Sequence, residues 1–127
     1  LAAWLLERRH SWGDCRGDIE FRFSKEHLLN TTLLYWLTDS FVSTARYYHE
    51  AANFSWQPEH SDLPVVSVPT ALSLFEHDLP PRPLDWTGSF YNLTSLKVYE
   101  SGGHFGAAEE PEQVVLDIRA HFKALRG

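Results

Sequence analysis

The chain has 127 residues, of which 11 are Lys or Arg and 17 are Asp or Glu, so its formal charge is −6. A chain of this length can bury a core as one domain or as part of one. The acidic balance, without any basic run, excludes a surface built for nucleic-acid phosphates. No apolar run reaches the roughly 18 residues that a membrane-spanning helix needs, so we expect no membrane segment here.

The cysteine and methionine contents bear on location and processing. A single cysteine, Cys15, leaves no internal disulfide and favours a reducing, cytoplasmic location. Three Asn-x-Ser/Thr triplets begin at Asn30, Asn53 and Asn92 and would accept sugar only in a secreted chain. The chain has no methionine and begins Leu-Ala-Ala. We therefore predict that it is a C-terminal piece of a longer product.

The first part of the chain is predicted to be helical. Apolar residues at helical spacing in "LAAWLLERRHSW" indicate a short amphipathic helix over residues 1–12, which ends near "GDCRGD". Ser24 is a predicted N-cap, because its hydroxyl can accept a hydrogen bond from a free amide of the first turn. An apolar face over residues 28–45 then predicts a second helix that runs to about Glu50.

The second part mixes strands and helices. Residues 51–63 show no periodicity and are predicted to be a loop. "VVSVPTALSLF", residues 65–75, is rich in β-branched and apolar residues and predicts a buried strand, with Pro69 at its end or at a sheet edge. Residues 83–86 are the expected start of a short helix, and "SLKVYES", residues 95–101, is a second strand by its alternation.

The last helix is the clearest element. Pro111 suits the first helical position, where its missing N–H costs nothing, and the acidic residues around it lie where the helix dipole favours negative charge. Its apolar stripe consists of Val114, Val115, Ile118, Phe122 and Leu125. The order of elements predicts the end of an α/β fold with parallel strands. Two such strands need neighbours, so the sheet is expected to be incomplete.

The histidines do not suggest a metal site. Seven histidines and one cysteine show neither the C-x-x-C nor the H-E-x-x-H spacing that places two ligands on one ion. We therefore predict neither a metal nor a cofactor.

Two residues that follow the predicted strands form a candidate catalytic pair. His104 follows the second strand behind two glycines, which allow a tight turn and a close approach to neighbouring groups. Asp78 follows the first strand. Parallel neighbours would bring this carboxylate and imidazole to one end of the sheet, as the orienting acid and the base of a hydrolase. Glu76 and Asp85 are rival acids that the spacing does not exclude.

The tyrosines of "RYYHEA" are a third candidate. A phenol in a dry pocket can donate a hydrogen bond to an oxygen that gains negative charge. Tyr48, with Tyr47 as its neighbour, is the residue in question. The alternative is that both rings pack at a helix end with their hydroxyls in water.

Four motifs resemble a known family. In order, and over nearly the whole chain, the sequence resembles the C-terminal part of the microsomal-type epoxide hydrolases, which have the α/β-hydrolase fold. The motifs are "LAAWLLERRHSW", "FSKEHLLNTTLLYWLTDSFVSTARYYHEA", "VPTALSLFEHDL" and "GGHFGAAEEPEQVVLDIRAHF". The resemblance implies that residues 1–52 are the end of a helical lid. Residues 53–127 are then the last two parallel strands of the core with their helices.

The resemblance also implies a chemistry. In that family an aspartate opens a small apolar epoxide to form an ester, and a histidine held by an acid activates the water that releases a vicinal diol. The family's histidine falls on His104, its acid on Asp78 and its lid tyrosine on Tyr48, while Trp36 lines the pocket or packs beneath it. The nucleophile elbow, the oxyanion-hole loop and the second lid tyrosine would precede Leu1. We therefore expect this chain to need that missing part and to be inactive alone.

Two other functions remain open. The acid and histidine loops would serve an esterase or a haloalkane dehalogenase equally well, and loss of the Tyr48 hydroxyl should impair only epoxide opening. A non-catalytic truncated module is the third hypothesis, which a cooperative unfolding transition of residues 1–127 alone would favour.

Overall fold

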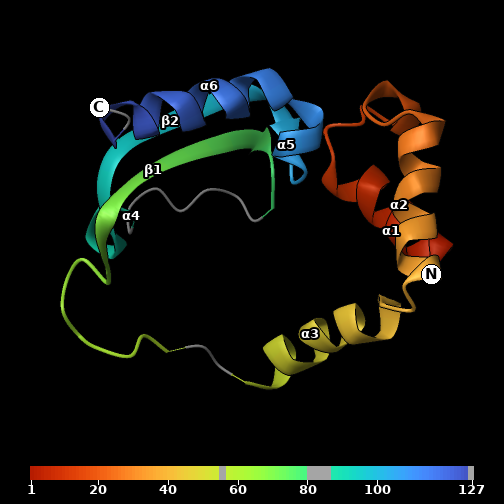
Figure 1. Ribbon diagram of the computed structural model, residues 1–127, viewed down its shortest axis with the longest axis horizontal. Coiled ribbons are helices and arrows are strands. Elements are labelled where there is room, and N and C mark those ends of the chain that lie inside the picture. The colour runs from red at the N-terminus through yellow and green to blue at the C-terminus, as the bar shows by residue number, and fades with distance from the viewer. Residues whose placement is uncertain (55–56, 80–86, 126–127) are drawn as a thin grey trace.

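The computed structural model describes residues 1–54, 57–79 and 87–125 (Figure 1). The elements of the first part are α1 (Ala2–Trp12), a 3₁₀ turn η1 (Ile19–Phe21), α2 (Lys25–Leu37) and α3 (Phe41–Asn53). The second part contains β1 (Val66–His77), α4 (Thr87–Phe90), β2 (Tyr91–Gly103), α5 (Gly106–Glu109), α6 (Pro111–His121) and a 3₁₀ turn η2 (Phe122–Leu125). The helix start expected at residues 83–86 lies outside the described residues.

The two strands are parallel, as the sequence predicts, and form a two-stranded sheet in the described part of the chain. β1 runs through Pro69 rather than ending there, and the ladder is irregular between Val66 and Pro69 because proline has no N–H to donate. The prediction of a buried strand is wrong for this chain, since Phe75 is the one residue of β1 that is buried. β1 has one neighbouring strand, and helix α6 lies along the sheet (Figure 1). These two elements leave most side chains of β1 partly or fully exposed.

The Ser24 cap is present, but the helix it begins is shorter than predicted. The Ser24 hydroxyl accepts from the His27 N–H at 3.1 Å, and α2 then ends at Leu37. Asp39 has φ of 50°, in the left-handed region that ends helices. The predicted continuous helix to Glu50 is therefore wrong, because the chain turns between α2 and α3 although the apolar pattern continues.

The N-terminal and C-terminal helices follow the sequence pattern. α1 spans the predicted residues and ends at the predicted turn, and α6 has Pro111 in its first turn. After His121 the chain tightens into η2, so the end of the apolar stripe lies beyond the α-helix. Within the described residues, no helix is both long and apolar enough to cross a membrane.

A small core joins the loop after α1 to the end of the sheet. Its buried residues are Cys15, Phe23 and Leu28, and Leu6, Ile19 and Phe105 pack against them. Because Phe105 directly follows His104, this core fixes the N-terminal helices next to the candidate histidine. Burial raises the pKa of the Cys15 thiol, with the nearby carboxylates of Glu109 and Asp14 adding to the effect, so Cys15 behaves as a packed, unreactive side chain.

Candidate active site

Asp78 and His104 occupy equivalent places at the ends of the two strands. β1 ends at His77 and β2 ends at Gly103, and these two residues are partners in the parallel ladder. The residue after each strand therefore emerges at the same edge of the sheet. The Nδ1 atom of His104 lies 2.8 Å from Oδ1 of Asp78. The structure thus brings together the acid and the histidine that the sequence singles out.

This contact determines which ring nitrogen remains available. An ionised carboxylate only accepts hydrogen bonds, so Nδ1 of His104 carries the proton and Nε2 is the free acceptor. The Asp78 carboxylate also accepts from the Leu79 N–H at 2.6 Å, which fixes its orientation. The side chains of His104 and Asp78 are 41% and 39% exposed, so water reaches the pair. The rival acid Asp85 lies outside the described residues.

The backbone around His104 is held at three consecutive amides. The His104 N–H donates to the Trp12 carbonyl at 2.9 Å. The Gly103 N–H donates to Oε2 of Glu109 at 3.0 Å, and the Phe105 N–H donates to Oε1 of Glu109 at 2.9 Å. The same Oε2 accepts from the Asp14 N–H at 2.7 Å. One carboxylate thus joins the chain on both sides of His104 to the loop that follows α1.

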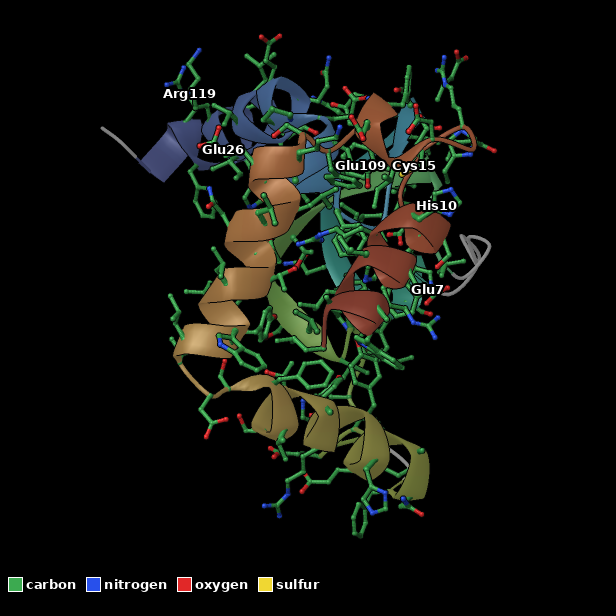
Figure 2. All side chains as sticks on the ribbon, turned by 90° about the vertical axis from the view of Figure 1, so that its right-hand side faces the viewer. Glu7, His10, Cys15, Glu26, Glu109 and Arg119 are labelled. Atoms are coloured by element: carbon green, nitrogen blue, oxygen red, sulfur yellow. The ribbon has the colours of Figure 1, made fainter. Side chains whose placement is uncertain are left out.

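Glu109 is one of the acidic residues around Pro111, and its carboxylate bonds to backbone amides outside the last helix. Glu109 closes α5 before α6 begins, and it is 7% exposed. In Figure 2 Glu109 lies near Cys15, at the junction of α5 with the loop after α1, while Glu7 and His10 point outward from α1. A sequence motif does not reveal this contact, because its partners lie 95 residues apart along the chain.

A second polar network covers the same junction. Arg22 donates to Oδ2 of Asp14 at 2.5 Å and to the Ser101 hydroxyl at 2.6 Å, and it pairs with Glu110 at 3.0 Å. Burial opposes ionisation of Asp14, but the bonds from Arg22 and from the Gly102 N–H outweigh it, so the pKa of Asp14 lies below its ordinary value. Burial likewise opposes the charge of Arg22, yet its bonds to Asp14 and Glu110 raise its pKa.

The glycine before His104 is required by close backbone contact. A Cβ atom placed on Gly103 would lie 2.7 Å from the Trp12 carbonyl oxygen and 2.8 Å from the Asp14 nitrogen. Both neighbours are backbone atoms that cannot turn aside. Gly102, at φ of 95°, adopts the left-handed conformation that glycine tolerates. The close approach expected from the two glycines is therefore present.

A cavity of about 130 Å³ joins His104 to Tyr48. Its other walls include Trp4, Arg8, Trp12 and Phe105. The Trp12 ring meets His104 edge-on at 5.0 Å between centroids, and the Trp4 ring meets Tyr48 in the same manner at 5.7 Å. The arrangement can present a phenol and an imidazole to one small molecule with aromatic surroundings.

Two further residues from the sequence lie elsewhere. Trp36 does not line this cavity; it is 70% exposed on α2 and borders a separate hollow next to Leu1. The expectation that it lines or supports the pocket is therefore wrong. Tyr47 packs edge-on against Tyr48 at 5.9 Å and is 71% exposed. Among the described residues, no three histidine, cysteine or acidic side chains are grouped to hold a metal ion.

Comparison with known proteins identifies relatives, although no family model matches the chain. The chain is 34% identical over 125 residues to epoxide hydrolase 1 of Oryctolagus cuniculus, which is 93% of this chain and 28% of the relative. Epoxide hydrolase 1 of Sus scrofa is 33% identical over 94% of this chain and 28% of its own length. The crystal structure of juvenile hormone epoxide hydrolase from the silkworm Bombyx mori matches with a TM-score of 0.79 and 29% identity.

These matches cover nearly all of this chain but less than a third of each relative. The silkworm structure is matched over 98% of this chain but 31% of its own, and the chain spans about 28% of the length of the curated relatives it matches. The predicted resemblance to the epoxide hydrolases is confirmed, and so is the predicted α/β-hydrolase fold. The matched share is consistent with a C-terminal part of that fold.

Proposed function

Since this chain is homologous over nearly its whole length to part of the epoxide hydrolases, we propose that it supplies the acid, the base and one tyrosine with which such an enzyme converts an epoxide to a vicinal diol. The observation that carries the proposal is the 2.8 Å contact between His104 Nδ1 and Asp78. It lies at the edge of a cavity that Tyr48 also lines. The aromatic walls of that cavity suit a small apolar epoxide.

The first half-reaction opens the epoxide ring. An aspartate from outside this chain attacks an epoxide carbon, the carbon–oxygen bond breaks, and an ester forms while the oxygen gains negative charge. The Tyr48 hydroxyl donates a hydrogen bond to that oxygen. A donor already held in place stabilises this charge without having to reorganise as the charge forms.

The second half-reaction hydrolyses the ester. Nε2 of His104 takes a proton from water, and the water oxygen adds to the ester carbonyl carbon. When the tetrahedral intermediate collapses, the ester oxygen leaves as an alcohol with the proton from the imidazolium. The second proton of the water is lost from the restored carboxyl group and balances the proton that the alkoxide of the first half-reaction takes up, so the aspartate is ionised again and both hydroxyls of the diol are complete. Asp78 holds the ring by its Nδ1–H and stabilises the imidazolium, but it does not take the proton.

The division of the chain follows from these roles. We propose that residues 1–52 are the end of the helical lid, which carries Tyr48, and that residues 53–127 are the strands and helices of the core, which carry Asp78 and His104. Since the nucleophile comes from outside, residues 1–127 alone should not turn over an epoxide.

The first test is His104→Gln in the protein expressed from its complete reading frame. With styrene oxide as the probe, the ester should form and accumulate to one equivalent, because only the second step uses the imidazole. Intact-protein mass spectrometry detects the ester, and steady-state turnover should fall by a factor of at least about 10². Turnover at the wild-type rate would remove His104 from the mechanism.

The second test separates an epoxide hydrolase from an esterase or a dehalogenase. Tyr48→Phe removes one oxygen and keeps the ring that packs on Trp4. Ester formation from the epoxide should slow about tenfold or more, because the developing alkoxide loses a donor. Hydrolysis of a p-nitrophenyl ester should stay within about twofold. Equal losses on both substrates would contradict the assigned role.

A further inference from the structure

We infer that Glu109 is a positioning residue for His104: its buried carboxylate holds the backbone on both sides of the histidine so that the imidazole meets Asp78. This inference rests on the proposed role of His104 as a base. It adds a residue that acts through His104 and does not touch the substrate.

The hydrogen bonds of Glu109 carry the inference. Its two oxygens accept from Gly103, Phe105 and Asp14 N–H groups at 3.0, 2.9 and 2.7 Å. Within the described residues Glu109 has no ion pair at contact distance, so the three backbone donors are its direct partners, and the Arg9 guanidinium adds an electrostatic attraction from farther away. An ionised carboxylate makes stronger bonds to N–H groups than a neutral acceptor does.

The same bonds leave the histidine little freedom. Between the two amides held by Glu109, the His104 N–H is bonded to the Trp12 carbonyl at 2.9 Å. Three successive amides thus have fixed acceptors, and only rotation of the His104 side chain remains. That rotation is limited by Asp78 on one side and by the Trp12 ring at 5.0 Å. A shift of the backbone would break the contact with Asp78, because hydrogen bonds weaken steeply with distance and angle.

The distinguishing variant is Glu109→Gln. Glutamine has the same shape but replaces one carboxylate oxygen with an NH₂ group. Whichever way the amide turns, that NH₂ faces at least one backbone N–H that needs an acceptor. Glu112→Gln is the matched control, because Glu112 is an exposed acid in the first turn of α6 and the change removes the same charge.

Two measurements on the protein from the complete reading frame test the inference. The first is amide hydrogen exchange at Gly103 and Phe105, together with the low-field proton resonance of the His104 Nδ1–H. The second compares the rate of ester formation with the rate of ester hydrolysis, with styrene oxide as the probe. A residue with a purely structural role would change both rates together, whereas a positioning residue for the base should change mainly hydrolysis.

For Glu109→Gln we expect exchange at the two amides to rise by about tenfold to a hundredfold. The Nδ1–H resonance should broaden or disappear. Ester hydrolysis should slow by at least about tenfold while ester formation stays within about twofold. Glu112→Gln should match the wild type in all of these. If Glu109→Gln does not fold, Glu109→Asp, which keeps the charge on a shorter side chain, should show the same pattern with smaller changes.

The inference fails if exchange and ester hydrolysis in Glu109→Gln equal those of the wild type. It also fails if both half-reactions slow equally, since Glu109 then acts on the fold as a whole. A different result would separate the two proposals. If the wild type forms no ester, the proposed function is overturned. If Glu109→Gln still shows faster amide exchange and loses the His104 Nδ1–H resonance, the positioning of His104 by Glu109 is still supported.

Discussion

Two largely buried carboxylates, Glu109 and Asp117, lie close together in the sequence but hold the molecule in different ways. Glu109 accepts from three backbone N–H groups. Asp117 accepts from side chains: the Ser73 hydroxyl at 2.5 Å, the Tyr99 hydroxyl at 2.8 Å and the Lys97 ammonium. The first therefore fixes the path of the chain around His104, while the second fixes how α6 lies on β1 and β2.

This difference predicts which carboxylate, with the groups bonded to it, tolerates the loss of a partner. A side chain that loses Asp117 can rotate and find water, because Lys97 is 47% exposed. The bonds from the Asp14 and Gly103 amides to Glu109 are buried and the bond from the Phe105 amide is partly buried, so these N–H groups have less access to water as a replacement. The network of Arg22 and Asp14 adjoins Glu109 through the Asp14 N–H and is similarly buried, so among the described residues it should be more sensitive than the Asp117 cluster. Matched changes of the two cations, Arg22 and Lys97, test this.

The largest effect is expected from Arg22→Met. Its removal would leave the Asp14 carboxylate, whose side chain is 3% exposed, without its main partner. Breaking a buried pair from one side costs about 3 to 5 kcal/mol. Urea unfolding of the protein from the complete reading frame should show a loss in the free energy of unfolding of this size. A loss of unfolding free energy below about 1 kcal/mol is typical of an exposed ion pair and would contradict the difference between the two clusters.

A smaller effect is expected from acid. Burial opposes ionisation of Asp117, but its bonds from Lys97, Ser73 and Tyr99 outweigh burial and lower its pKa below the ordinary 3.8. The pKa of Asp14 is lowered as well. Each carboxylate thus stabilises the fold fully above about pH 4, and that contribution is lost as the pH falls through the lower folded-state pKa.

Asp117→Asn isolates one of these contributions. The free energy of unfolding, measured from pH 6 to pH 3, should fall with decreasing pH in the wild type and fall less steeply in the variant. The difference in slope is at most about 1.4 kcal/mol per pH unit for one group. Identical slopes would show that Asp117 is not stabilised in its charged form.

The smallest effect on the free energy of unfolding is expected from Lys97→Met, which removes the cation beside Asp117 as Arg22→Met removes the cation beside Asp14. The ion pair of Lys97 with Asp117 is screened by water, and the two hydroxyl donors to Asp117 remain. The urea midpoint should be nearly unchanged and insensitive to added salt. A loss as large as that of Arg22→Met would show that the two clusters do not differ as we describe.

The sequence predicted the elements on which the site depends. The apolar runs locate the strand ends, which places Asp78 and His104 at one edge of the sheet, and Pro111 marks the start of the last helix. Their 2.8 Å contact agrees with that expectation. The resemblance added Tyr48, which lines the same cavity as His104.

Other features depend on contacts that local patterns do not encode. The end of α2 depends on the left-handed conformation of Asp39, while the apolar pattern continues through it. Glu109 has the same sequence context as an ordinary helix-start acid, and its role depends on the loop at Asp14, far away along the chain. The exposure of β1 depends on how many strands and helices cover it, and among the described residues one strand pairs with it.

The pairing of His77 with Gly103 has an evolutionary consequence. Because acid and base each follow one of these paired residues, the connection between the strands can gain or lose residues without separating them. A single insertion in the regular part of the ladder, where residues 71–75 pair with residues 95–99, would shift one partner along the ladder and misalign the pair. Homologues should therefore differ in length between β1 and β2 far more often than inside them, and a deep alignment would reveal that pattern as gaps confined to the connection.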